Sequence, residues 1–196
     1  MSSRRFPGKM LAPFHGKPLI DHVMAAAIKA SGQRETILLT SDHPTDDPLA
    51  AYATTCGWQL FRGNLKNVHK RFCDALTTFP AKFIGRICGD SPLISVDLLL
   101  DVQKAALTGR FDLVTNVYPR TFPKGQSIEV IKSQALFNVN TTVLNAEEQE
   151  HVTPYFYNRN NNYKIYNFVK PNEFPIKFDC VVDTLEDLRR LESLPL

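Results

Sequence analysis

Residues 82–107 read KFIGRICGDSPLISVDLLLDVQKAAL, an apolar run, a polar turn and an amphipathic run in direct succession. Residues 82–88 have the length and the apolar content of a buried strand. The turn contains Asp90, and the apolar positions of residues 96–107 recur with helical spacing. A strand that leads through a short polar turn into a helix is the building unit of an α/β protein.

The same alternation of strands and helices extends toward the N-terminus. The expected strands are residues 35–40, 58–62, 82–88 and 112–115, and the expected helices are residues 18–31, 48–56, 67–79 and 96–107. Parallel sheets bind ligands at the carboxyl ends of their strands. We call that rim the active edge, and we expect Asp42, Arg62 and Asp90 to lie on it.

The pattern changes after residue 116, where the elements become shorter. We expect a loop at residues 119–125, strands at residues 127–131, 163–169 and 179–183, helices at residues 133–139 and 146–157, and a terminal helix from Thr184. No repeat or linker divides the chain, so we expect a single domain over residues 1–196.

Composition excludes several classes of protein. The chain has 196 residues with 43% hydrophobic and 22% charged residues, which is typical of a globular domain. A net charge of +3 is too small to indicate nucleic acid as a partner. No apolar run approaches the roughly 20 residues of a membrane span. The four cysteines are scattered, which suits free thiols in a reducing compartment, so we expect a cytoplasmic location.

Three groups of residues are candidates for chemistry. Ser3, Arg5 and Lys9 lie in a basic loop with a Pro-Gly turn, which can cradle phosphates, although a solvated basic terminus has the same composition. Asp90 and Asp183 each follow or end an expected strand and could bind Mg²⁺ together. The alternative for these two is a structural role, in a turn for Asp90 and beside a helix N-cap for Asp183.

The third group consists of polar residues in the C-terminal half. Arg120 lies in the 119–125 loop and could meet an anionic substrate, while Glu150 and His151 could make polar substrate contacts. Loop cations are often merely solvated, and a lone histidine is often a surface residue. The residue types alone therefore leave both interpretations open.

Eight segments in chain order resemble the cytidylyltransferase family that includes spore-coat polysaccharide biosynthesis F-type proteins. CMP-sialic acid and CMP-KDO synthetases are its more distant relatives. Residues 1–9, MSSRRFPGK, resemble the later part of the family loop A-R-M-G-S-S-R-L-P-G-K. The other matching segments are residues 16–19, 40–48, 61–63, 86–94, 119–125, 150–155 and 183–188.

The resemblance implies a three-layer, mainly parallel Rossmann-like sheet of the nucleotide-diphospho-sugar transferase type. It implies a nucleotidyltransferase that moves CMP from CTP to an acidic, nonulosonate-like sugar with Mg²⁺ as cofactor, for surface polysaccharide biosynthesis. Residues 1–116 would form the nucleotide-binding half, and residues 117–196 the sugar-binding and dimerisation half, so a homodimer is expected. The implied roles are triphosphate binding by Ser3, Arg5 and Lys9, cytidine binding by Arg62, Mg²⁺ binding by Asp90 and Asp183, and sugar binding by Arg120, Glu150 and His151.

Some positions depart from the family pattern. Ser2 stands where the family has glycine, Cys88 where it has threonine, and Ser127 where it has aspartate. The family's first strand would precede Met1, so we expect the natural start to lie about 8–12 residues upstream. Two other functions stay open, a glycosyltransferase-like nucleotide-sugar enzyme and a non-catalytic truncated remnant. Nucleotide preference separates the first of these from a cytidylyltransferase, and CTP binding separates the second.

Overall fold

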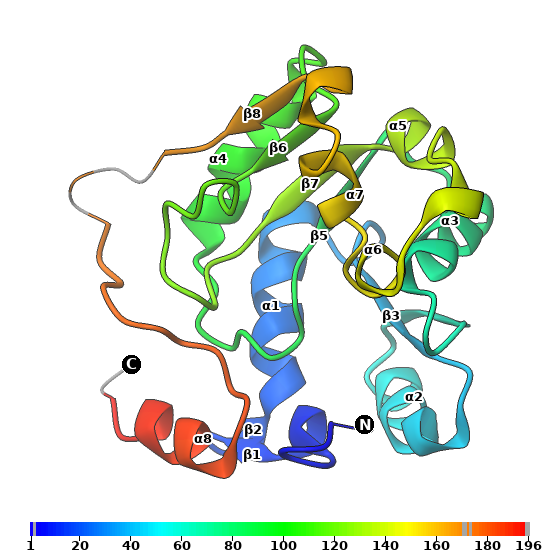
Figure 1. The fold of residues 1–196 in the computed structure, drawn as a ribbon. Coiled ribbons are helices and arrows are strands. Elements are labelled where there is room, and N and C mark those ends of the chain that lie inside the picture. Colours follow the sequence, from blue (N-terminus) through cyan, green and yellow to red (C-terminus); the bar gives the residue numbers. More distant parts are fainter. Residues whose placement is uncertain (2, 170–171, 173, 195–196) are drawn as a thin grey trace.

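The computed structural model describes residue 1, residues 3–169, residue 172 and residues 174–194, and Figure 1 shows its fold. The N-terminal half contains η1 (Lys9–Leu11), β1 (Pro13–Phe14), β2 (Lys17–Pro18), α1 (Leu19–Ser31), β3 (Ile37–Ser41), η2 (Pro44–Asp46), α2 (Asp47–Thr55), β4 (Gln59–Gly63), α3 (Val68–Thr78), β5 (Phe83–Arg86), α4 (Val96–Leu107) and β6 (Leu113–Thr115). The C-terminal half contains β7 (Glu129–Lys132), α5 (Ser133–Phe137), η3 (Thr141–Val143), α6 (Ala146–His151), α7 (Pro154–Tyr157), η4 (Asn160–Asn162), β8 (Ile165–Asn167) and α8 (Leu185–Glu192).

The central strands form two hydrogen-bonded sheets. β3 and β4 pair in parallel, and the larger sheet has the order β5-β7-β6-β8. Both β5 and β6 run antiparallel to β7, while β8 runs parallel to β6, so β7 alone is reversed in this sheet. Among the residues that the structure describes, no strand pairs with the second edge of β3 or of β5. The strand that the family resemblance places before Met1 stays a prediction.

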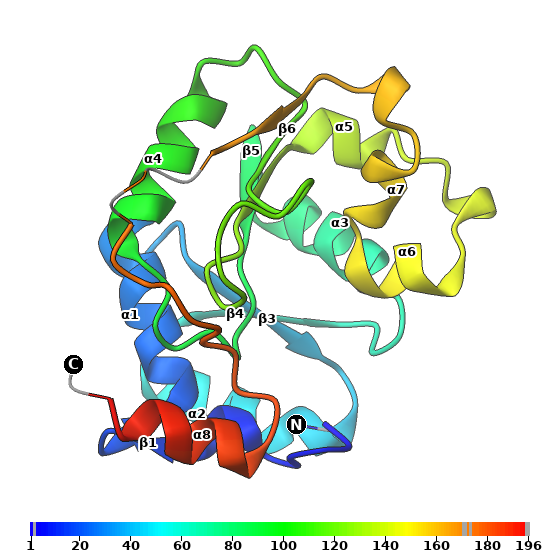
Figure 2. The ribbon, with the colours of Figure 1, turned by 60° about the vertical axis from the view of Figure 1, so that its left-hand side comes forward.

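Helices cover both faces of the larger sheet, which gives the three layers that the sequence predicts. Figures 1 and 2 show α1 and α4 on one face and α3, α5, α6 and α7 on the other. Successive side chains of a strand point to opposite faces. Val114 and Val130 therefore pack into the core beneath α4, while Leu113 and Ile131 pack into the core beneath α3 and α5–α7.

Local capping explains where several helices begin and end. The Asn67 side chain accepts a hydrogen bond from the Lys70 backbone N–H and caps α3. Thr184 and Asp187 form a reciprocal capping box at the start of α8, the terminal helix expected from Thr184. At the end of α1, Gly32 has φ 92° and donates its N–H to the Ile28 carbonyl, a conformation that favours glycine.

Two predicted elements in the C-terminal half are wrong. The helix expected over residues 146–157 is divided into α6 and α7 by a tight turn at Val152, which has φ 68° and ψ −60°. The Thr153 N–H donates to the His151 carbonyl at 2.7 Å, so the turn is the rare γ-turn with a positive φ. The sequence does carry a signal for the break in Pro154, which begins α7, because proline is favoured at the first position of a helix and disfavoured in its interior.

The strand expected at residues 179–183 is an extended segment outside any sheet. Its backbone N–H groups bond to two different loops, Cys180 to the Lys124 carbonyl at 2.8 Å and Val182 to the Asp90 carbonyl at 2.9 Å. The segment leads into α8, which lies beside the N-terminal residues in Figure 1 and packs with Phe14 and Leu19. The C-terminal end of the chain therefore closes over its beginning.

No helix in the described part of the chain is both long enough and apolar enough to cross a bilayer.

Candidate active site

The N-terminal loop is folded by its own backbone. Gly8 has φ 75°, and its N–H bonds to the Met1 carbonyl at 3.1 Å, while the Phe6 N–H bonds to Ser3 Oγ at 3.3 Å. The side chain of Ser3 thus stabilises the loop that carries Arg5 and Lys9. Ser2, where the family has glycine, lies outside the described residues.

Lys9 is the centre of the candidate site. Its side chain is buried, and Nζ donates to Asp90 Oδ2 at 2.8 Å, to the Val182 carbonyl at 2.8 Å and to Asp183 Oδ1 at 3.3 Å. An ammonium has three protons, so these acceptors use its whole donor capacity. Arg5 approaches the same group from solvent, with Nη2 2.9 Å from Asp183 Oδ2.

The two carboxylates come from opposite ends of the fold. Asp90 follows β5, and its carbonyl accepts the hydrogen bond from Val182 that ties the C-terminal segment to this turn. The Asp183 N–H in turn bonds to Asp187 Oδ2 at 3.2 Å, at the start of α8. The side chains of Asp90 and Asp183 remain 23% and 37% exposed, so both can reach a ligand from solvent.

The paired carboxylates fit a divalent cation of the Mg²⁺ type. Both supply oxygen ligands and both reach one ammonium, so they converge on a common point. Within the described part of the chain, no group of three or more histidine, cysteine or acidic side chains is arranged to hold a metal ion. Two carboxylates suffice for Mg²⁺, which commonly takes waters and substrate phosphates as its remaining ligands.

This geometry can be compared with known proteins. A family model described as Cytidylyltransferase matches residues 1–194. The chain belongs to the cytidylyltransferase family. The family and the enzyme class predicted from the sequence, a CTP-dependent nucleotidyltransferase, are confirmed at this level.

Individual cytidylyltransferases and related proteins agree with this family. Spore coat polysaccharide biosynthesis protein SpsF of Bacillus subtilis (strain 168) is 30% identical over 201 residues, which cover 99% of this chain and 82% of SpsF. The 8-amino-3,8-dideoxy-manno-octulosonate cytidylyltransferase of Shewanella halifaxensis (strain HAW-EB4) is 27% identical over 204 residues, with 98% and 80% covered. A solved cytidylyltransferase structure from Leptospira borgpetersenii serovar Hardjo-bovis (strain JB197) has a TM-score of 0.91 at 28% identity, covering 98% of this chain and 82% of that one.

Arg62 lies at the carboxyl end of β4, as the sequence predicts for the active edge. Its Nε donates to the Ser41 carbonyl at 2.9 Å, and Nη2 donates to Asp47 Oδ1 at 2.6 Å and to the His43 carbonyl at 3.2 Å. Arg62 thus braces the loop between β3 and α2. A role in cytidine binding stays a prediction.

The predicted sugar-side residues do not contact the Lys9 cluster. Arg120 Nη1 donates to Ser127 Oγ at 2.9 Å, so the serine that replaces the family aspartate has a partner in the same loop. Glu150 and His151 end α6 with exposed side chains. The structure brings Arg5, Lys9, Asp90 and Asp183 together and leaves these other residues apart from them.

Sequence reasoning missed a second polar cluster on the larger sheet. Glu129 is buried, its Oε2 lies 2.6 Å from Arg86 Nη1, and its Oε1 accepts from the Tyr157 hydroxyl at 2.5 Å. The available signal was Glu129 itself, a charged residue at an inward position of an apolar strand. A buried carboxylate needs charged or hydrogen-bonding partners.

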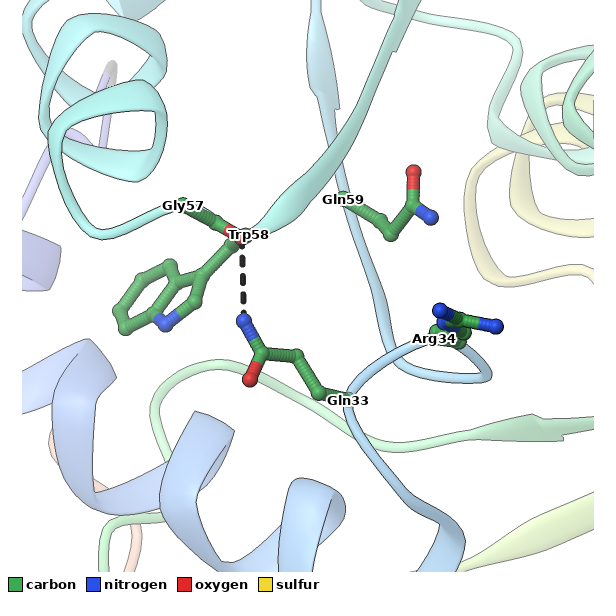
Figure 3. A pocket seen from close by; sticks show the side chains of 5 residues that line it. All are labelled: Gln33, Arg34, Gly57, Trp58 and Gln59. Atoms are coloured by element: carbon green, nitrogen blue, oxygen red, sulfur yellow. Dashed lines mark hydrogen bonds between the residues drawn. The ribbon is translucent and has the colours of Figure 1, made fainter.

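A pocket lies on another part of the molecule. One pocket of about 450 Å³ is lined by Gln33, Arg34, Gly57, Trp58 and Gln59, and Figure 3 shows Gln33 donating across it to the Gly57 carbonyl at 3.2 Å. These residues precede or begin β3 and β4. The pocket is therefore at the amino ends of these strands, opposite the active edge where Lys9 and its partners lie.

Proposed function

We propose that this cytidylyltransferase transfers CMP from CTP to an acidic, nonulosonate-like sugar with release of pyrophosphate, for surface polysaccharide biosynthesis. The observation that carries the proposal is the convergence of Arg5 and Lys9 with Asp90 and Asp183 at the active edge. The names of the relatives, a spore coat polysaccharide protein and a cytidylyltransferase for an acidic octulosonate, support the choice of substrate and pathway class.

Arg5 and Lys9 would bind the triphosphate. The sugar hydroxyl attacks the α-phosphorus in line, and the bond to the pyrophosphate oxygen breaks. Such chemistry depends mainly on positioning and on neutralising the negative charge of the phosphates. The exposed guanidinium of Arg5, 66% accessible to solvent, and the buried ammonium of Lys9 supply two cations at different depths of the site.

Asp90 and Asp183 would hold the Mg²⁺ that we infer as cofactor. A bound Mg²⁺ supplies further charge neutralisation and orientation of the phosphates. In the described structure the Lys9 ammonium occupies the region between the two carboxylates. Lys9 would therefore exchange these acceptors for phosphate oxygens when substrate and cofactor bind.

The remaining parts of the proposal concern the C-terminal half. Arg120, with an exposed guanidinium, would meet the sugar carboxylate, and Glu150 and His151 would line the sugar side. Arg62 would support the cytidine side through its hold on the loop after β3. We also propose a cytoplasmic protein that forms a homodimer through residues 117–196.

A pyrophosphate-release assay tests the proposal. It combines each of the four nucleoside triphosphates with a panel of acidic and neutral sugars, with and without Mg²⁺. The expected result is release that requires CTP, Mg²⁺ and an acidic sugar together. A preference for a nucleoside-diphosphate sugar over CTP would instead point to glycosyl transfer, and CTP binding without turnover on any sugar would indicate a non-catalytic protein.

A further inference from the structure

A row of three side chains crosses the larger sheet at its active-edge end. Glu129 begins β7, and its register partners are Arg86 at the end of β5 and Thr115 at the end of β6. Side chains that are directly opposite in neighbouring strands lie side by side on one face. The row therefore lies where β5 and β6 finish, the rim from which Asp90 also projects.

The hydroxyl of Tyr157, from α7, contacts two side chains of this row. It donates to Glu129 Oε1 at 2.5 Å and lies 2.9 Å from Thr115 Oγ1. Burial, together with the charge of Glu129, raises the pKa of Tyr157 far above that of a free phenol. Tyr157 is therefore a permanent donor, and because Arg86 binds the other oxygen, both oxygens of the Glu129 carboxylate have a partner within the protein.

Tyr118 lies on top of Tyr157. The two rings stack with centroids 4.5 Å apart and planes 9° from parallel, and the Asn160 side-chain amide donates to the Tyr118 hydroxyl at 3.2 Å. Tyr118 is nevertheless 39% exposed. One face of its ring is thus held against Tyr157, and the ring is presented to solvent at the end of β6.

The backbone that positions Tyr157 is strained. The γ-turn at Val152 puts a β-branched, fully buried residue at φ 68°, directly before α7. Such conformations are energetically costly and persist where the surrounding structure enforces them, often at binding sites. Here the turn redirects the chain so that α7 places Tyr157 over Glu129.

We propose that Tyr118 is a specificity-determining platform for the sugar, and that Arg86, Glu129 and Tyr157 position it. A partly exposed ring held by stacking suits the apolar C–H face of a pyranose, while Arg120, two residues further along the loop, suits the carboxylate of the same sugar. This inference rests on the proposed function, because it names the part of that site that selects the sugar ring.

The test compares Tyr118→Ala and Tyr118→Phe with a matched control, Tyr166→Ala. Tyr166 is similarly exposed, at 38%, and its ring stacks on Phe111 with centroids 4.9 Å apart, but it lies opposite Val114 and therefore on the other face of the sheet from the row. KM and kcat are measured with CTP and the acidic sugar that the wild type turns over fastest. CTP binding is measured separately by calorimetry.

Tyr118→Ala is expected to raise the sugar KM about tenfold and to leave the affinity for CTP unchanged, since the variant removes the aromatic ring on which the sugar would stack. Tyr118→Phe retains the ring and should stay within about threefold of the wild type, as should Tyr166→Ala. An unchanged sugar KM in Tyr118→Ala, or an equal rise of the sugar KM in Tyr166→Ala, overturns the proposed platform role of Tyr118.

Tyr157→Phe tests the positioning part, because it keeps the stacked ring and removes the hydroxyl that holds Glu129. We expect a rise in the sugar KM smaller than in Tyr118→Ala, with kcat and CTP affinity retained. A loss of CTP affinity together with the sugar effect would show general disruption and contradict a positioning role.

The platform role of Tyr118 can be tested even if the protein does not have the proposed transferase activity. If the wild type releases no pyrophosphate with any acidic sugar, saturation-transfer NMR with 3-deoxy-manno-octulosonate, N-acetylneuraminate and neutral hexoses replaces the kinetic readout. Sugar signals that disappear in Tyr118→Ala and persist in Tyr166→Ala support the platform. Absence of sugar binding by the wild type, or binding that Tyr118→Ala retains, overturns it.

Discussion

Two carboxylate–cation clusters in this cytidylyltransferase differ in almost every physical respect. Glu148 in α6 is buried and accepts hydrogen bonds from Arg159 Nη1 at 2.6 Å, Asn158 Nδ2 at 3.1 Å and the Asn145 N–H at 3.2 Å, all from neighbours close in sequence. Asp90 and Asp183 are partly exposed and share the Lys9 ammonium, which lies 81 and 174 residues away along the chain.

We infer from this difference that the first cluster is structural and the second functional. In the first, a single carboxylate has a full set of donors that hold α6 and α7 together, so nothing remains for a ligand. In the second, two negative charges share the cations Lys9 and Arg5, and both keep oxygen atoms accessible to solvent. Paired, accessible carboxylates are suited to a further cation and to phosphate chemistry.

The largest expected effect follows from Asp90→Ala. The variant should lose at least about 100-fold in kcat, because it removes a group that we place at the metal and the triphosphate. Its melting temperature should stay within a few degrees of the wild type, since Asp90 is partly exposed. Steady-state pyrophosphate release measures the first and calorimetry the second.

The control for this variant is Asp74→Ala. Asp74 also forms a short ion pair, 2.6 Å from Lys70 Nζ, but on the exposed surface of α3. Its turnover should match the wild type. Wild-type turnover in Asp90→Ala would show that the functional cluster has been misassigned.

Lys9→Met should produce the next largest effect. It should weaken catalysis with CTP and tighten metal binding without CTP. The kcat/KM for CTP should fall by about 100-fold because a triphosphate cation is lost. Binding of Mn²⁺ without CTP should become tighter, by roughly tenfold, because no ammonium competes for the two carboxylates. Titration followed by electron paramagnetic resonance measures the metal affinity directly.

Lys70→Met is the matched control for this metal-binding experiment. It also removes a lysine from a short ion pair but lies away from the active edge, so its Mn²⁺ affinity should equal that of the wild type. Weaker Mn²⁺ binding in Lys9→Met would mean that Lys9 organises the carboxylates for the ion instead of competing with it.

Glu148→Gln should act on stability and leave catalysis intact. Replacing a buried, hydrogen-bonded carboxylate by an amide leaves donors mismatched, and we expect the free energy of unfolding at pH 7 to fall by about 1–3 kcal/mol. Urea denaturation measures the change. Glu150→Gln, at an exposed position of the same helix, should change it by less than about 0.5 kcal/mol.

The smallest expected effect is the pH dependence of the difference in unfolding free energy between the wild type and Glu148→Gln. Burial alone would raise the pKa of Glu148, but hydrogen bonds from Arg159, Asn158 and Asn145 outweigh it and hold the pKa below the ordinary 4.5. The stabilisation is therefore complete above the ordinary pKa and is lost as the pH falls through the lower folded-state value. The stability gap between wild type and Glu148→Gln should be constant from pH 7 to about 5.5 and should narrow below about 4.5; a gap that widens in acid would contradict the assignment.

Sequence-based prediction is most accurate for features that depend on residues close together in the sequence. The helix expected over residues 96–107 coincides with α4, and the helices expected from residue 67 and from Thr184 begin there with Asn67 and Thr184 as caps, because helical periodicity and capping involve residues within a few positions. The boundary between α6 and α7 has a local signal in Pro154 that was overlooked, whereas the strained conformation of the buried Val152 depends on the packing around it. The strand expected at residues 179–183 was wrong because apolar content alone does not specify a pairing partner.

The sequence by itself determined the family, the layered α/β fold and the kinds of side chain needed for phosphate chemistry. Only the tertiary structure decided that Lys9 reaches Asp90 and Asp183, and that Arg86, Glu129 and Tyr157 form one row. The physical reason is that secondary structure follows short-range periodicity, whereas these contacts depend on strand register and on the C-terminal segment closing over the N-terminal loop.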